Sequence, residues 1–141
     1  MKKRILVLLT VATVMLVMGV GVALAVNRQC NGTPCRGTNN NDVLYERVGN
    51  HRSDRILGLR GSDDMSAALY TRDRDRLFGG PNGDRIVVND GDSRDLANGG
   101  RGRDICYIDR GDRTRSCNST RVAAAGVNPS GFGNTATNSE N

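Results

Sequence analysis

A repeat of about 21 residues constrains the fold of this chain more than any other feature of its sequence. Four segments each begin with Gly, carry Asp at the sixth position and, with the exception of Cys106, have an aliphatic residue or Met at the eighth. Their Asp residues lie 21, 21 and 20 residues apart. A near-constant period of this length is typical of repeat proteins, in which each repeat adds one unit to a stack. The segments are residues 37–45 (GTNNNDVLY), 58–66 (GLRGSDDMS), 79–87 (GGPNGDRIV) and 99–107 (GGRGRDICY), with Asp42, Asp63, Asp84 and Asp104 at the sixth position.

A second, weaker series lies between the segments of the first. The chain therefore alternates turn and strand twice per period, which predicts an all-β solenoid with about one coil per 21 residues. With two Phe, three Tyr and no Trp, the chain lacks the aromatic side chains of a thick globular core, in keeping with a repetitive, turn-rich fold. The second-series segments are residues 49–57 (GNHRSDRIL), 70–78 (YTRDRDRLF) and 90–98 (DGDSRDLAN), with Asp54, Asp75 and Asp95 at the sixth position.

The first series resembles a known calcium-binding repeat. Residues 99–107 and 58–66 lie closest to the pattern G-G-x-G-x-D-x-U-x, and residues 79–87 have Asn82 in place of its third Gly. This pattern is the haemolysin-type calcium-binding nonapeptide, also called the RTX repeat. The resemblance covers roughly residues 36–117, and the segment CYIDRGDRTRSC (106–117) looks like the end of small exported proteins that carry such repeats. The resemblance implies a parallel β-roll of about four coils, which holds calcium between successive turns on one side.

The residue types in these turns suit that chemistry. Gly permits positive φ and lets carbonyl groups point toward a cation, and Asn tolerates the left-handed region better than other residues. Asp supplies the hard anionic oxygen that calcium prefers. The predicted calcium-site residues are Asp42, Asp63, Asp84 and Asp104, with the turn residues Gly37, Asn40, Gly58, Gly61, Gly79, Asn82, Gly99 and Gly102.

Stacking makes a counter-charge necessary. Adjacent coils lie about 4.8 Å apart, and two like charges about 5 Å apart repel by about 3 kcal/mol at an effective dielectric constant near 20. Calcium can supply the counter-charge, but so can the many Arg residues beside the Asp positions. In the second series the fourth position, where the calcium-binding pattern has Gly, is occupied by Arg52, Asp73 and Ser93. We therefore expect that side of the roll to have lost its metal sites. A metal-free solenoid held by Asp–Arg pairs is the alternative.

Alternation along the strands predicts a thin apolar core between the two sides of the roll. Burial of about ten such side chains leaves a small margin of stability, which metal ions or disulfides usually supplement in small scaffolds. The predicted inward residues are Leu44, Val48, Met65, Ala67, Leu69, Ile86 and Val88 on one side, and Ile56, Leu77 and Ala97 on the other.

The first 25 residues differ from the rest. A basic start (Met1 to Arg4) precedes an apolar run that ends in Ala23-Leu24-Ala25, which predicts a cleaved signal peptide over residues 1–25. An uncleaved membrane anchor is the alternative, because the run is long enough to span a bilayer. Without these residues the net charge falls from +5 to +2, and acidic and basic residues alternate closely. Charge therefore gives no support for nucleic-acid binding.

Four Cys residues in an exported chain predict two disulfides. Three pairings are possible, and we expect the local one, Cys30–Cys35 and Cys106–Cys117, because each pair flanks one end of the repeats. Their spacing, with a single His in the chain, argues against zinc. The predicted organisation is a signal peptide (1–25), an N-terminal cap (26–36), calcium-binding repeats (37–117) and a disordered tail (118–141).

No constellation of catalytic groups is visible. His51 is the only His and lies in a turn, and the Asp63-Asp64 pair is accounted for by the repeat. We therefore expect a secreted calcium-binding module rather than an enzyme, with calcium ions as its partner and no small-molecule cofactor. The alternative is a calcium-independent, Arg-rich solenoid that binds anionic cell-surface polymers through an outward basic ladder, including Arg55 and Arg76.

Overall fold

The computed structural model describes residues 24–32, 34–49, 51–69 and 73–123. Within these ranges the chain forms strands and no helix, and no helix there is long and apolar enough to cross a membrane. Nearly all of the predicted signal peptide, and the predicted tail from residue 124 onward, lie outside the described residues.

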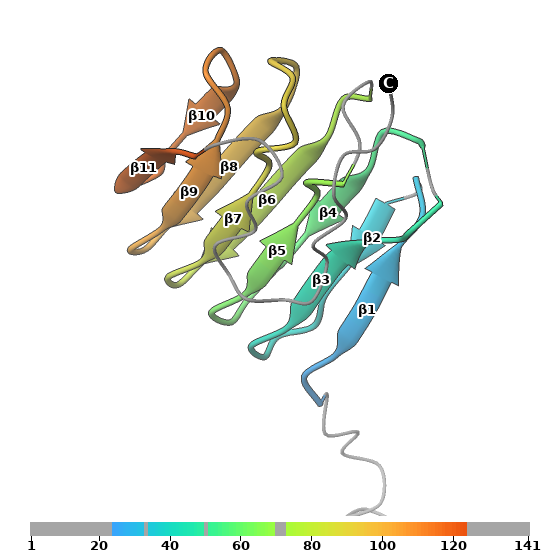
Figure 1. Ribbon diagram of the computed structural model, residues 1–141. Coiled ribbons are helices and arrows are strands. Elements are labelled where there is room, and N and C mark those ends of the chain that lie inside the picture. The colour runs from blue at the N-terminus through green and yellow to red at the C-terminus, as the bar shows by residue number, and fades with distance from the viewer. Residues whose placement is uncertain (1–23, 33, 50, 70–72, 124–141) are drawn as a thin grey trace, which may run out of the picture.

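The strands form two parallel sheets that the chain visits alternately, so the described region is a parallel β-solenoid of about four coils (Figure 1). The six-stranded sheet has the order β1-β3-β5-β7-β9-β11, and the five-stranded sheet the order β10-β8-β6-β4-β2. The strands are β1 (Asn27–Cys30), β2 (Pro34–Arg36), β3 (Val43–Glu46), β4 (Arg55–Leu57), β5 (Asp64–Ser66), β6 (Arg76–Pro81), β7 (Arg85–Val87), β8 (Leu96–Arg101), β9 (Ile105–Ile108), β10 (Arg113–Arg115) and β11 (Ser119–Val122).

The pairing register follows the sequence period. In the six-stranded sheet Leu44 pairs with Met65 and Met65 pairs with Ile86, so each strand residue lies beside its equivalent one coil later. The first-series turns lead from the five-stranded to the six-stranded sheet, and the second-series turns lead back. All Asp positions of one series therefore lie on the same side of the solenoid.

The core lies between the two sheets and consists of stacked equivalent side chains. The predicted inward positions are confirmed except one: Val48 is 61% exposed. That prediction was wrong because Val48 lies in the turn that follows β3, which ends at Glu46, and this turn directs its side chain to solvent. The buried hydrophobic residues of the core cluster are Cys30, Cys35, Leu44, Ile56, Met65, Ala67, Leu77, Ile86, Val88, Ala97, Cys106 and Ile108.

Disulfides lie at both ends of the stack. Cys30–Cys35 connects β1 of one sheet to β2 of the other, and Cys106–Cys117 connects β9 to the segment between β10 and β11. These are the two local pairs that we expected, and they indicate an oxidising, extracellular setting. Each fixes the spacing of elements where the neighbouring coil is missing on one side.

The C-terminal end extends further than predicted. Residues Ser119–Val122, which we assigned to the disordered tail, form β11 and pair with β9. Their side chains are mostly exposed, so the strand is held by backbone hydrogen bonds to its neighbour rather than by burial. Because the segment has no alternating apolar pattern, its sequence does not indicate a strand.

Candidate metal centre

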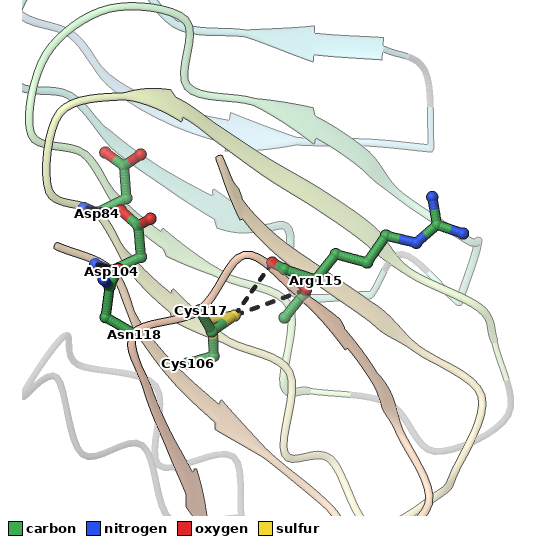
Figure 2. Close-up of a disulfide and its surroundings, with 7 residues drawn as sticks. Asp84, Asp104, Cys106, Arg115, Cys117 and Asn118 are labelled. Atoms are coloured by element: carbon green, nitrogen blue, oxygen red, sulfur yellow. Dashed lines mark hydrogen bonds between the residues drawn. A yellow bond between two sulfur atoms is a disulfide. The ribbon is translucent and has the colours of Figure 1, made fainter. Parts of the chain in front are cut away.

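The first-series Asp residues form a ladder of side-chain hydrogen bonds across the coils. Oδ1 of Asp63 accepts from the backbone N–H of Asp42 at 2.8 Å, and the same contact joins the next pairs at 2.8 and 2.9 Å. We call Asp42, Asp63, Asp84 and Asp104 the first ladder. Asn118 closes it, because its Oδ1 accepts from the N–H of Asp104 at 2.9 Å (Figure 2). A neutral amide thus replaces the carboxylate at the end of the column.

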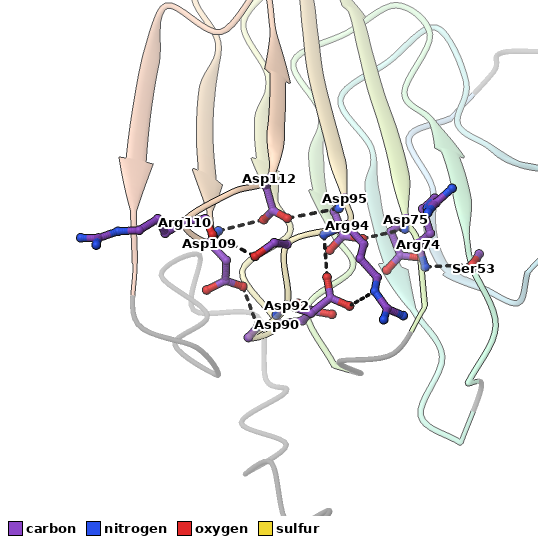
Figure 3. Close-up of polar contacts among 12 residues, drawn as sticks. Ser53, Arg74, Asp75, Asp90, Asp92, Arg94, Asp95, Asp109, Arg110 and Asp112 are labelled. Carbon is purple, nitrogen blue, oxygen red and sulfur yellow. Dashed lines mark hydrogen bonds and ion pairs between the residues drawn. The ribbon is translucent and has the colours of Figure 1, made fainter.

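The second series forms an equivalent ladder on the opposite side. Oδ1 of Asp75 accepts from the N–H of Asp54 at 2.6 Å, and Oδ1 of Asp95 accepts from the N–H of Asp75 at 2.8 Å. Asp112 completes this second ladder by accepting from the N–H of Asp95 at 3.1 Å (Figure 3). Both series thus use Asp to orient the preceding turn, although only the first has the Gly-rich turn pattern.

The second oxygen of most ladder carboxylates has no donor. Within the described residues, each ladder has members whose Oδ2 is buried and without a hydrogen-bond partner. A buried anionic oxygen of this kind is costly unless a proton or a cation reaches it. The residues concerned are Asp63, Asp84 and Asp104 of the first ladder and Asp75 and Asp95 of the second.

In the first ladder, two of these oxygens border the same space as a carbonyl group of the next coil. A Cβ on Gly58 would lie 2.7 Å from the carbonyl oxygen of Gly79 and in contact with Oδ2 of Asp63. The corresponding position on Gly79 lies beside Oδ2 of Asp84 and 2.5 Å from the carbonyl oxygen of Gly99. In both turns a carboxylate oxygen and a carbonyl oxygen thus border a space that only Gly leaves open, and oxygens of these two kinds are ligands that calcium prefers.

The turn conformations agree with part of the sequence analysis. Asn82 has φ of 87° and so takes the left-handed conformation, as its fourth position predicts, whereas Asn40 is not among the described residues with positive φ. The first-position glycines also have no positive φ. Their role is to leave space for the Asp carboxylate, not to supply conformational freedom. The predicted site residues occupy four successive first-series turns: Gly37, Asn40 and Asp42; Gly58, Gly61 and Asp63; Gly79, Asn82 and Asp84; Gly99, Gly102 and Asp104.

The closest groups of carboxylates lie on the second-series side, where we expected no metal. One group, the acidic triad, consists of Glu46, Asp73 and Asp75, and a second cluster consists of Asp90, Asp92 and Asp95. In each group the ligand oxygens lie within 4.8 Å of one another. Figure 3 shows the second cluster next to Asp109 and Asp112 of the last coil. These buried acidic groups could hold a metal ion.

Burial makes ionisation less favourable for two carboxyl groups in each ladder. It raises the pKa of Asp63 to about 6 and that of Asp84 to about 7, and neighbouring ladder carboxylates add repulsion. In the second ladder burial, with repulsion from nearby acids, raises the pKa of both Asp75 and Asp95 to about 9. In the absence of a cation, Asp75 and Asp95 therefore favour the protonated form at neutral pH, whereas Asp63 and Asp84 are only more easily protonated than an exposed Asp.

Arginine offsets acids outside the ladders. Arg85 forms an ion pair with Asp64 at 3.6 Å, and Arg94 forms one with Asp92 at 3.7 Å. Asp64, which we expected to face solvent, is partly buried. The outward basic ladder is short, because the exposed Arg55 and Arg76 pair in register but the next position is Leu96.

Sequence reasoning missed several members of these clusters. Glu46 lies two residues after the inward Leu44, so alternation could have predicted that it is buried. Asp112 and Asn118 lie 17 and 14 residues after the ladder members they follow, and this shortened spacing hides them from a search at 21 residues. Asp73 has no such signal, because it occupies a turn position that is Arg or Ser in the other second-series segments.

Fold and site together define a parallel β-solenoid whose turns stack buried carboxylates. No protein-family model matches the chain, and neither does any curated protein or solved structure.

Proposed function

We propose that this protein is a secreted calcium-binding β-roll module of the haemolysin-type repeat kind, which folds on calcium outside the cell. The observation that carries the proposal is the buried, donorless Oδ2 of Asp63, Asp84 and Asp104. The first two of these oxygens each border a space that is also bordered by a carbonyl oxygen of the next coil. Carboxylate and carbonyl oxygens without nitrogen or sulfur are the ligand set of calcium.

Calcium would supply the positive charge that neutralises the stacked carboxylates. The ion pairs of Arg85 and Arg94 involve Asp64 and Asp92, and neither carboxylate belongs to a ladder. This favours calcium over the alternative in which Arg alone neutralises the ladders. Calcium is scarce in the cytosol and abundant outside the cell, so a chain that depends on it would remain unfolded during export. The apolar leader over residues 1–25 and the two disulfides support export.

The role we propose is binding and structural rather than enzymatic. The ladder Asp residues already have a structural partner in the backbone of the preceding coil, and the only His, His51, is exposed. Neither feature supplies the paired acid and base that catalysis would need.

Circular dichroism of the oxidised protein, titrated with calcium and then with EDTA, tests the proposal. We expect calcium to increase the β signal and the melting temperature, because an ion that binds only the folded state stabilises it by mass action. Magnesium at the same concentration should have a smaller effect, since it prefers a tighter octahedral site. A protein equally folded and equally stable in EDTA and in calcium would instead be a metal-free solenoid.

A further inference from the structure

Three carboxylates of the acidic triad converge from two successive coils. Glu46 ends β3, whereas Asp73 and Asp75 lie in the turn that leads into β6 (Arg76–Pro81). Their ligand oxygens all lie within 4.8 Å of one another. The triad lies on the second-series side of the solenoid, away from the Gly-rich turns of the first ladder.

The triad is buried and largely without donors. Glu46 is 1%, Asp73 7% and Asp75 0% exposed. Oε2 of Glu46 accepts from the backbone N–H of Leu69 at 3.1 Å, and Oδ1 of Asp75 accepts from the N–H of Asp54 at 2.6 Å. The remaining four oxygens, Oε1 of Glu46, Oδ2 of Asp75 and both of Asp73, have no hydrogen-bond partner within the described residues.

Nearby charges increase the need for a cation. Burial raises the pKa of Glu46 to about 9, and Asp73, Asp54 and Asp90 add repulsion. His51 acts in the opposite direction on Asp73, but it is the weakest of the influences on that carboxyl. Three buried acids with so little opposing charge are stable only if they are protonated or bind a cation.

The position of Glu46 in the stack is a second, independent indication. The paired strands end one residue earlier, at Tyr45–Ser66, Ser66–Val87 and Val87–Tyr107. Continued by one residue, this register puts Glu46 in one inward column with Ala67, Val88 and Ile108. In the later coils this position is aliphatic and buried. Glu46 is thus one carboxylate in an otherwise apolar column, and it faces two Asp residues of the next coil. Burying it there costs free energy, which a bound ion would offset.

We propose that Glu46, Asp73 and Asp75 form a calcium-class divalent-cation site, separate from the first ladder. Its side-chain ligands are carboxylate oxygens, which suit a hard cation rather than zinc or copper. The ion would join the end of β3 to the turn before β6 and so lock two coils together. This site does not depend on the first ladder binding calcium, because the two share no residue.

Calcium stoichiometry and affinity, measured by isothermal titration of the oxidised protein with calcium chloride, test the site. The variant is Glu46→Gln, which keeps the shape of the side chain and its acceptor toward Leu69 while removing the charge. Asp64→Asn is the matched control, because Asp64 is paired with Arg85 and belongs to neither site. Asp63→Asn reports on the first ladder. Asp73→Asn repeats the test at the more exposed edge of the triad, so the answer does not rest on the folding of one variant.

We expect Glu46→Gln and Asp73→Asn to lose one class of sites or to weaken it by about tenfold or more, with Asp64→Asn unchanged. In EDTA both triad variants should melt above the wild type, since each removes a buried acid whose ionisation burial disfavours, and calcium should raise their melting temperature less. Unchanged stoichiometry and affinity in both triad variants would overturn the triad site. If only Asp63→Asn reduces calcium binding, the first ladder binds calcium and the triad does not. If only the triad variants reduce calcium binding, the triad binds calcium and the first ladder does not.

Discussion

Oδ1 of Asp84 accepts a hydrogen bond from the backbone N–H of Asp63, one coil earlier, at 2.8 Å. The other oxygen of the same carboxylate is buried and has no donor within the described residues. One Asp therefore does two separate things: it orders the turn before it, and it places a negative charge where a cation can offset it. Substitution can separate these two roles.

Asp84→Ala should be less stable than Asp84→Asn, both in EDTA and in calcium. It leaves the buried N–H of Asp63 without an acceptor, which costs about 1–3 kcal/mol. Asp84→Asn keeps an acceptor oxygen and removes only the charge, so in EDTA we expect it to be at least as stable as the wild type. In calcium it should gain less stability than the wild type. Urea denaturation in EDTA and in calcium measures both effects, and equal destabilisation by both substitutions in EDTA would contradict this separation of roles.

The calcium-free protein should become less stable as the pH rises. The folded-state pKa values of Asp63 (about 6), Asp84 (about 7) and Asp95 (about 9) lie above the unfolded value of about 4. Stability from the protonated forms is thus complete below about pH 4 and is lost as the pH rises toward about 9. In EDTA we expect the melting temperature to fall by about 5 °C or more between about pH 5 and about pH 9.

With calcium present, the same pH series should give a different profile. Calcium binds the deprotonated carboxylates, so its stabilising effect should grow with pH. The curve in calcium should then be flatter than the curve in EDTA, or rise. Two parallel curves would indicate that these acids do not bind the ion.

Gly79→Ala should be far more damaging than a change at a glycine with free space around it. A Cβ at Gly79 would meet the carboxylate of Asp84 and the carbonyl oxygen of Gly99, and overpacking of this kind costs about 1–3 kcal/mol. It should also reduce calcium affinity, because it displaces both oxygens. Gly49→Ala is the control: Gly49 has φ of 82° but nothing within 4 Å of the added atom, so only backbone strain of about 1–2 kcal/mol applies. A calcium affinity that is equally reduced in both variants would argue against the first-ladder site.

The two disulfides should contribute unequally. Chain-entropy arguments give about 2 kcal/mol for the Cys30–Cys35 loop, with a sequence separation of 5, and about 3 kcal/mol for Cys106–Cys117, with a separation of 11. Replacing each pair by Ala and measuring thermal unfolding checks the order. A larger loss at Cys30–Cys35 would mean that joining the two sheets at the N-terminal end matters more than loop length.

The sequence predicted the parts of the fold that repeat. The spacing of Asp42, Asp63 and Asp84 gave the coil length, and alternation identified inward residues such as Met65 and Leu77, because translation from coil to coil keeps each position in the same environment. The features it missed break that regularity. Val48 lies beyond the end of a short strand, and β11 is held by backbone pairing that no side-chain pattern encodes.

The candidate sites were predictable to a lesser degree. The Gly and Asp residues of the turns identified the first ladder, because the local conformation of such a turn requires these residue types. The acidic triad brings together Glu46 and Asp75, which lie in different segments and are neighbours only because the coils stack. Such a site depends on register and burial as well as on sequence, and a motif confined to nine residues does not contain it.

The in-register stacking of the coils also has a consequence for how such a gene can change. Gly58 and Gly79 begin equivalent turns, so unequal crossing-over between their codons would insert or delete one complete coil and leave every strand pair and ladder contact in phase. The spacing of 20 rather than 21 residues between Asp75 and Asp95 shows where single-residue changes are tolerated. The missing residue falls in the second-series turn, and the strands on either side keep their register. Length in this protein can therefore change by whole coils, and a smaller change such as this one is absorbed in a turn while the strands stay paired.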